Sequence, residues 1–307
     1  MSEGSDTTAS SDGSGSTRGS GDGLASTGTG VLDGSGGTSD GDGRTDSDTS
    51  TGALPDTDTD TETDTDTDTG AGTDVCAPVQ PPQLLMDFGD IRLYLYEEVV
   101  SRQTFSQSAV DTPLQQQYIE FLEQVDADWP SVDVFDQLAL LAHQRDVFVD
   151  AGIDDGALWD ALIDGSIGEV TSVICLHSIF FDLQNQDFPV WNASTELAAA
   201  VLTQEIDGQT HIRAYIQTQD GILGVFDNSF IDAAEDDLAA GWDMLAHFHS
   251  HPFAPDNQFG DVAGTVIPSD PDIATFQSLS ATHDLREAWI SNGIHSLRLL
   301  DEEFNAL

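Results

Sequence analysis

The sequence predicts an α/β (α+β) fold, in which helices flank a mixed sheet, with a helical N-terminal extension and a disordered acidic tail. Three observations lead to this prediction. Residues 1–75 have almost no apolar side chains, residues 84–184 carry apolar groups mainly at helical spacing, and several later runs alternate apolar and polar residues as strands do. We therefore divide the chain into a tail (1–75), a mainly helical extension (76–190) and a sheet-containing domain (191–307).

Acidic residues dominate the chain. Its 307 residues include 56 Asp and Glu against 8 Arg and no Lys, which gives a formal net charge of −48. Nucleic acids and anionic membrane surfaces bind clustered positive charge, so the composition argues against both as partners. No apolar run approaches the ~18 residues of a membrane span, so we expect no membrane insertion. A cationic substrate, a salty or Ca²⁺-rich medium, or solubility alone would each account for the charge.

The tail consists largely of Ser, Thr, Gly and Asp. Residues 56–69 are nearly pure Asp-Thr alternation, and a segment with so little to bury cannot offset the entropy lost on ordering. Such tails usually tether a domain outside the cytoplasm, so we expect a secreted or cell-envelope protein. The opening MSEGSDTTASSDG lacks the apolar core of a signal peptide. An export signal would therefore precede Met1, or export would take another route.

Apolar residues at helical spacing predict helices in the extension at 115–125, 134–149, 157–163 and 167–183. We expect His143 and His177, within these helices, to be packed or surface residues. Cys175 is either a buried thiol or, in an exported protein, the disulfide partner of Cys76.

Period-two patterns predict two hairpins in the sheet-containing domain. Asp207-Gly208 joins the first pair of strands and Asn292-Gly293 the second. The elements expected in this domain are strands at 196–204, 211–219, 224–226, 288–290 and 294–300, a short helix or loop at 233–240, and a short helix or frayed end at 302–307.

The most informative stretch begins at residue 244, where His247, His249 and His251 alternate with apolar residues up to Pro252. This pattern predicts a strand with its imidazoles on one face. His249 and His251 would lie about 6.6 Å apart along that face. Two imidazoles so placed can converge on one Zn²⁺, with bonds of roughly 2.0–2.1 Å. His247 shares the face and would either orient a ligand or pack beneath the site.

A helix is predicted at 269–280, with Ser269 as its N-cap, Pro271 in its first turn and Asp272 at its third position. A carboxylate is favoured at the start of a helix, so Asp272 would face the histidine pair as a third ligand. Three protein ligands with an open fourth position are typical of catalytic zinc.

His-Ser-His-Pro followed by Ser-x-x-Asp resembles the JAMM motif of JAB/MPN-domain metallopeptidases. The resemblance covers residues 191–300 and implies a JAB/MPN-like (cytidine-deaminase-like) mixed sheet. It also implies zinc on His249, His251 and Asp272, with Ser269 assisting near the bound water. Seventeen residues separate His251 from Ser269, about twice the compact family spacing, and the excess would form a lid or substrate loop. Longer spacers of this kind resemble JAB-related domains of bacterial secreted or polymorphic-toxin proteins.

The resemblance also implies a general acid/base Glu one hairpin upstream of the histidines. Glu196, a lone carboxylate at the start of an apolar strand, matches that place. Glu205 is the rival, but it lies beside the Asp207-Gly208 turn, where we expect it to be solvated. The predicted function is a zinc-dependent peptidase or isopeptidase that acts on a protein or peptide. The alternative is a non-catalytic JAB-fold binding module on a cell-surface or secreted protein.

Overall fold

A computed structural model of the chain describes residues 76, 78–100, 113–128, 133, 135–153, 155–190, 195–221, 229–253 and 264–307. All of them belong to one compact unit, Asp68–Leu307. The predicted disordered tail, the strand expected at 224–226 and most of the predicted lid lie outside the described residues.

The described part of the fold is mixed α/β, built on a single sheet of eight strands in the order β1-β2-β5-β4-β6-β7-β8-β3. Neighbouring strands are antiparallel except for the parallel pair β6–β7. The strands are β1 (Gln83–Asp87), β2 (Ile91–Val100), β3 (Glu169–Ser172), β4 (Ala198–Ile206), β5 (Gln209–Gln219), β6 (Asp243–Ser250), β7 (Glu287–Ser291) and β8 (His295–Leu300).

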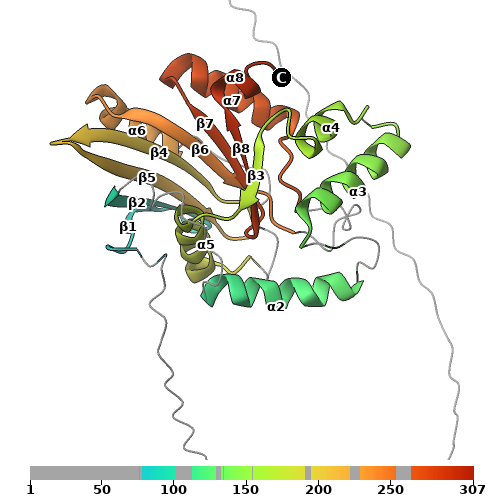
Figure 1. The fold of residues 1–307 in the computed structure, drawn as a ribbon. Coiled ribbons are helices and arrows are strands. Elements are labelled where there is room, and N and C mark those ends of the chain that lie inside the picture. Colours follow the sequence, from blue (N-terminus) through green and yellow to red (C-terminus); the bar gives the residue numbers. More distant parts are fainter. Residues whose placement is uncertain are drawn as a thin grey trace, which may run out of the picture. The chain divides into compact units, whose positions relative to one another are not determined.

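Helices cover both faces of this sheet (Figure 1). One face packs against α4, α6, α7 and α8, and the other against α2 and α5. The helices described are α2 (Pro113–Asp128), α3 (Gln137–Asp150), α4 (Ala157–Ile163), α5 (Cys175–Asp187), α6 (Ser229–Ala239), α7 (Asp270–His283) and α8 (Asp301–Phe304). Within the described ranges, none of these helices has both the length and the apolar character that a membrane span needs.

Most of the elements predicted from local patterns are confirmed. Helices α2, α3 and α4 lie where apolar spacing predicted them. The side chain of Asp136 caps the start of α3, because its carboxylate accepts a hydrogen bond from the Ala139 amide. The two hairpins β4–β5 and β7–β8 turn at Asp207-Gly208 and Asn292-Gly293. The later segments also form α6, β6, α7 and α8.

The expectation that residues 84–184 are mainly helical is wrong at 84–100, which form β1 and β2. The sequence of β2, IRLYLYEEVV, alternates: Leu93 belongs to one apolar layer and Tyr94 and Tyr96 to the other. Period-two burial with aromatic and β-branched residues favours a strand. Because β2 pairs with β5 over ten residues, the predicted extension contributes to the same sheet as the predicted domain.

The helix expected at 167–183 is also partly wrong, because residues 169–172 form β3 and only Cys175–Asp187 are helical. Gly168 explains the difference. It has φ +68°, and a Cβ there would lie 2.7 Å from Leu297 Cδ1, so the chain turns at this point against β8. β3 then pairs with β8 at the end of the sheet.

Cys76 and Cys175 form a disulfide, which decides between the two states considered for Cys175. The bond ties the beginning of the described chain to the first residue of α5, across 99 positions of sequence. In the chain-entropy model, closing a loop of this length stabilises the folded state by up to about 4–5 kcal/mol. Structural disulfides belong to oxidising compartments, which agrees with the expectation of an exported protein.

Three consecutive alanines in β4 position the histidine strand. Ala198 pairs with His249 and Ala200 with His247, while Ala199 pairs with Phe248 on the opposite face. Side chains directly opposite each other in an antiparallel pair lie on the same face of the sheet. The small methyl groups of β4 therefore leave room for imidazoles beneath α6 and α7, and for the Phe248 ring towards α5.

Candidate metal centre

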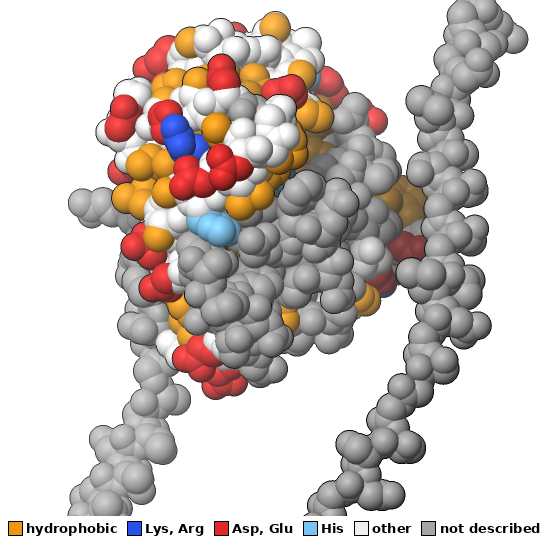
Figure 2. Space-filling model, turned by 90° about the vertical axis from the view of Figure 1, so that its right-hand side faces the viewer, with side chains coloured by type: hydrophobic (Ala, Val, Ile, Leu, Met, Phe, Trp, Pro, Cys, Tyr) orange, Lys and Arg blue, Asp and Glu red, His pale blue; other side chains and the backbone are white. Residues whose placement is uncertain are grey.

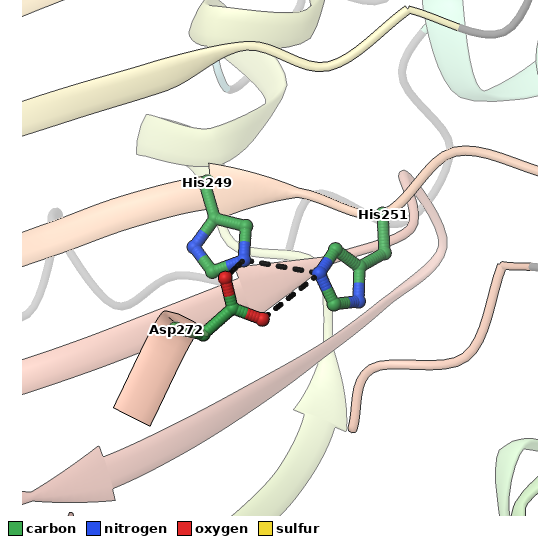
Figure 3. A group of neighbouring side chains, drawn as sticks. All are labelled: His249, His251 and Asp272. Atoms are coloured by element: carbon green, nitrogen blue, oxygen red, sulfur yellow. Dashed lines mark hydrogen bonds and ion pairs between the residues drawn. The ribbon is translucent and has the colours of Figure 1, made fainter. Parts of the chain in front are cut away.

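His249, His251 and Asp272 converge at the end of β6 (Figure 3). The backbone remains extended up to His251, because the His251 amide donates to the carbonyl of Ser291 in β7 over 2.8 Å. The Nε2 atoms of His249 and His251 lie 3.0 Å apart. The Asp272 carboxylate enters from the start of α7, with Oδ1 3.3 Å from Nε2 of His249 and Oδ2 3.5 Å from Nε2 of His251.

These separations suit a tetrahedral metal ion. With ligand bonds of roughly 2.0–2.1 Å, neighbouring ligand atoms of a tetrahedral zinc site lie roughly 3.3–3.4 Å apart. The three measured distances, 3.0, 3.3 and 3.5 Å, bracket that value. The three side chains predicted from the sequence thus form a group that could hold a metal ion, and imidazole donors suit several divalent transition metals, zinc among them.

The His251 ring is oriented by a backbone carbonyl. Its Nδ1 lies 3.1 Å from the oxygen of Thr265. A carbonyl can only accept, so in the neutral ring Nδ1 carries the hydrogen and the lone pair of Nε2 points at the other two donors. Contacts of this kind fix the tautomer of metal-binding histidines and increase their basicity.

Asp272 is held by the N-terminal cap of α7. The amide and the hydroxyl of Ser269 both donate to Asp272 Oδ2 over 2.7 Å, and the Asp272 amide donates back to the hydroxyl over 3.4 Å. Ser269 is the N-cap, as predicted, and with Asp272 it forms a capping box, which fixes the carboxylate in front of the histidines. Ser269 contacts the ligand Asp272; its predicted role at the oxyanion stays a prediction.

The electrostatics of the cluster favour an ionised carboxylate. Burial acts to raise the pKa of Asp272, but hydrogen bonds and charges from His249 and His251 outweigh it and hold the pKa far below its usual range. Burial acts to lower the pKa of His251, but hydrogen bonding to Asp272 and the charges of Asp272 and Glu196 raise it overall. A negative charge facing two imidazoles provides the field that a divalent cation requires.

Glu196, the predicted acid/base, lies two residues before β4, whose first residue, Ala198, pairs with His249. The Glu196 side chain is half-buried. Its charge acts on the pKa of His251, which places it within electrostatic reach of the site.

Two hydrogen bonds clamp the segment that carries Glu196. The Leu197 amide donates to the hydroxyl of Ser250, and the Ser250 amide donates to the Leu197 carbonyl, each over 2.9 Å. Glu205, the rival acid/base, is exposed near the other end of β4 and accepts a hydrogen bond from Thr210. It lies about 23 Å along the strand from Ala198, too far to reach the cluster.

His247 packs beneath the site. Its ring centre lies 5.7 Å from that of Phe230 and 5.6 Å from that of Phe276, and burial lowers its pKa to about 3. Its Nδ1 has no hydrogen-bond partner among the described residues. The ring is therefore neutral, and of the two roles considered for His247 the packing role agrees with these contacts.

One residue that contributes to the site was predicted only as part of a turn. Asn292 is fully buried, and its Nδ2 donates to the Gly264 carbonyl over 2.7 Å and to Gln137 Oε1 over 3.0 Å. Gly264 precedes Thr265, the residue whose carbonyl orients His251. Asn292 thus connects the β7–β8 turn to the Gly264–Thr265 backbone, which contacts the proposed ligand His251. The Asn-Gly pattern in the sequence predicted the turn but not this contact.

We expect Asn292→Asp to weaken zinc binding by about 10–100-fold, the usual effect of removing an outer partner of a metal ligand. The substitution keeps the Oδ1 acceptor for the amides of Ile294 and His295 but removes the donor that holds Gly264. Zinc affinity is measured by competition with a chromophoric chelator. Asn305→Asp, at an exposed amide, is the control. Unchanged affinity in a folded Asn292→Asp protein would mean that other contacts hold the Thr265 carbonyl.

The cluster reaches the protein surface. The side chains of His251 and Asp272 are 21% and 19% exposed, whereas that of His249 is only 3% exposed. Among the residues that the structure describes, no fourth His, Cys, Asp or Glu joins the group as a ligand. A three-ligand site with one side towards solvent leaves a position for a water molecule or a substrate.

Comparison of the chain with protein-family models, with curated proteins and with solved structures found no match. The geometry of the site therefore carries the functional argument.

Proposed function

We propose that this protein is a zinc-dependent hydrolase of the JAB/MPN type, which cleaves a peptide or isopeptide bond. The observation that carries the proposal is the meeting of all three predicted ligands, with separations of 3.0–3.5 Å, beside Glu196. In chain order, Glu196 precedes β4, His249 and His251 follow at the end of β6, and Asp272 comes last at the start of α7, which is the order that the JAMM resemblance implies. The mixed sheet with helices on both faces is compatible with a JAB/MPN-like fold.

Each residue has a role that follows from its position. His249, His251 and Asp272 would hold the ion, and bound zinc acidifies water and polarises a carbonyl oxygen. Glu196, whose charge acts on His251, would accept the proton of the attacking water and return it to the leaving amine. Ser269 fixes the Asp272 carboxylate through its hydroxyl and its amide. In this proposal the single hydroxyl hydrogen turns from Asp272 to the developing oxyanion during the reaction, while the Ser269 amide keeps its hydrogen bond to Asp272.

The test is a cleavage assay with the purified full chain. We expect zinc-loaded protein to hydrolyse either fluorescence-quenched peptides or a substrate joined through a lysine ε-amide. The two substrates separate peptidase from isopeptidase activity. Phenanthroline should abolish cleavage, and added zinc should restore it. Full zinc occupancy without cleavage of either substrate class would overturn the catalytic proposal in favour of the non-catalytic binding module.

A further inference from the structure

Exposed apolar side chains gather at the β1 edge of the sheet, far from the metal centre. Six of the ten large hydrophobic residues that stand out as exposed in the described structure lie between residues 79 and 99. Val79 is 73% exposed and Phe88 61%. We call this set the edge surface; it consists of Val79, Leu84, Leu85, Met86, Phe88 and Val99. Contiguous apolar surface of this kind usually marks an interaction site.

The edge surface is built on an edge strand. β1 is the outermost strand of the sheet, and its five residues are all exposed. Among the described strands β1 pairs only with β2. The backbone amides and carbonyls on the outer edge of β1 therefore have no partner strand among the described residues and could pair with an added strand. Edge strands are usually blunted by Lys, by Pro or by a bulge. β1 has an irregularity between Leu84 and Met86, but neither Lys nor Pro lies within it.

A groove of about 400 Å³ adjoins this strand. Val79 and Val99 of the edge surface line it, so the groove and the edge surface are continuous. Its other apolar walls are Ile206, Ile212 and Trp242. The groove lies beside the segment that leads into β1 and over the ends of β2, β4 and β5, so it extends the exposed surface past the start of β1.

The charge at this edge is negative. Glu97 and Glu98 line the groove, and the one arginine that lines it, Arg213, is already paired with Glu97 and Asp237. Each of the five arginines in the described ranges forms an ion pair with at least one carboxylate. Acidic side chains also outnumber basic ones on a different face of the molecule, the α3 and α4 side that Figure 2 shows. A cationic partner would complement such a surface, and an anionic one would be repelled.

We propose that the edge surface binds an extended segment of a partner protein in which apolar and basic residues alternate, and that this segment adds to β1 as a further strand. Its apolar side chains would cover Leu84 and Phe88, and its basic side chains would be attracted by the carboxylates near this edge, which include Asp87, Glu97 and Glu98. The chain's own residues 1–74 do not fit, because they have few apolar side chains and 17 acids against two Arg. A second copy fits poorly, since it would bring like charges together.

The proposed surface is separate from the metal centre. Four strand spacings of roughly 4.8 Å each separate β1 from β6, or about 19 Å. Binding at the edge surface is therefore measurable without any enzymatic activity, and its failure leaves the proposed hydrolase function untouched.

The test uses the full chain and a short fluorescent peptide in which valine and lysine alternate. We expect saturable binding by fluorescence anisotropy at low salt, weaker binding at high salt, and no binding of the matched peptide with glutamate in place of lysine. Hydrogen exchange should slow at the β1 amides when the lysine peptide is bound. Leu84→Ser should raise the Kd by about tenfold. Leu138→Ser is the matched control, because Leu84 and Leu138 are both 47% exposed and Leu138 lies on α3.

Three outcomes would overturn the proposal. The first is equal affinity for the lysine and glutamate peptides, which would remove the charge argument. The second is an equal loss of binding in Leu84→Ser and Leu138→Ser, which would place the peptide elsewhere. The third is self-association in sedimentation that Leu84→Ser abolishes, which would make a second copy the occupant.

Discussion

Replacing His251 by alanine should leave a folded protein that no longer holds zinc. Bound metal should fall from about one ion per chain to less than about a tenth of that. The reason is that the site needs three protein ligands, and the two that remain should not retain the zinc ion. The rest of the fold should persist, since the sheet and its two apolar layers do not depend on the cluster. Metal content after dialysis is measured by mass spectrometry, and folding by circular dichroism.

Thermal unfolding gives an independent measurement of the same loss. A ligand that binds only the folded state stabilises it by about 2.7 kcal/mol at a free concentration of 100 Kd. Added zinc should therefore raise the melting temperature of the wild type and leave that of His251→Ala unchanged.

His283→Ala is the control for the metal prediction, because His283 ends α7, the helix whose first turn contains Asp272, and forms an ion pair with Glu235 at 3.8 Å. This variant should retain its zinc and its zinc-dependent stabilisation. Full zinc occupancy in His251→Ala would place the ion elsewhere in the chain, and equal losses in both variants would indicate a general effect on folding.

The ligands could be predicted because each signal is local. Alternation from His247 to His251 defines a strand face within five residues, and Ser269 and Asp272 define a helix start within four. Such short-range patterns persist whatever the rest of the chain does. The approach of α7 to β6 is not local, and the prediction that these residues meet drew on the helix-start position of Asp272 together with the family resemblance.

The parts that were missed depend on long-range pairing. Strand β2 completes its hydrogen bonds with β5, whose residues lie more than 100 positions later, and nothing near β2 announces that partner. Asn292 has an ordinary turn signal, but its contribution to the site depends on Gly264, 28 positions earlier. Both features depend on tertiary contacts. Buried polar groups find hydrogen-bond partners that are close in the fold but distant in the sequence, and local patterns do not reveal those partners.

Replacing Glu196 by glutamine should lower the rate of amide hydrolysis by about 10²–10⁴-fold while the bound zinc stays at the wild-type level. Glutamine has nearly the shape of glutamate but cannot take a proton from water. The clamp between Leu197 and Ser250 uses backbone and hydroxyl groups only, so the segment should stay in place. Single-turnover cleavage and metal content are measured on the same protein sample.

Glu205→Gln separates a catalytic role from a general effect of removing negative charge. Both glutamates belong to the β4 region and both changes remove one charge, but Glu205 lies at the opposite end of the strand and is exposed. Its substitution should leave hydrolysis within about twofold of the wild type, as expected for a surface position. Wild-type turnover in Glu196→Gln would assign the proton transfer to another group. Loss of zinc together with turnover would mean that the carboxylate supports the ion, because a residue that only moves protons leaves the ligand set intact.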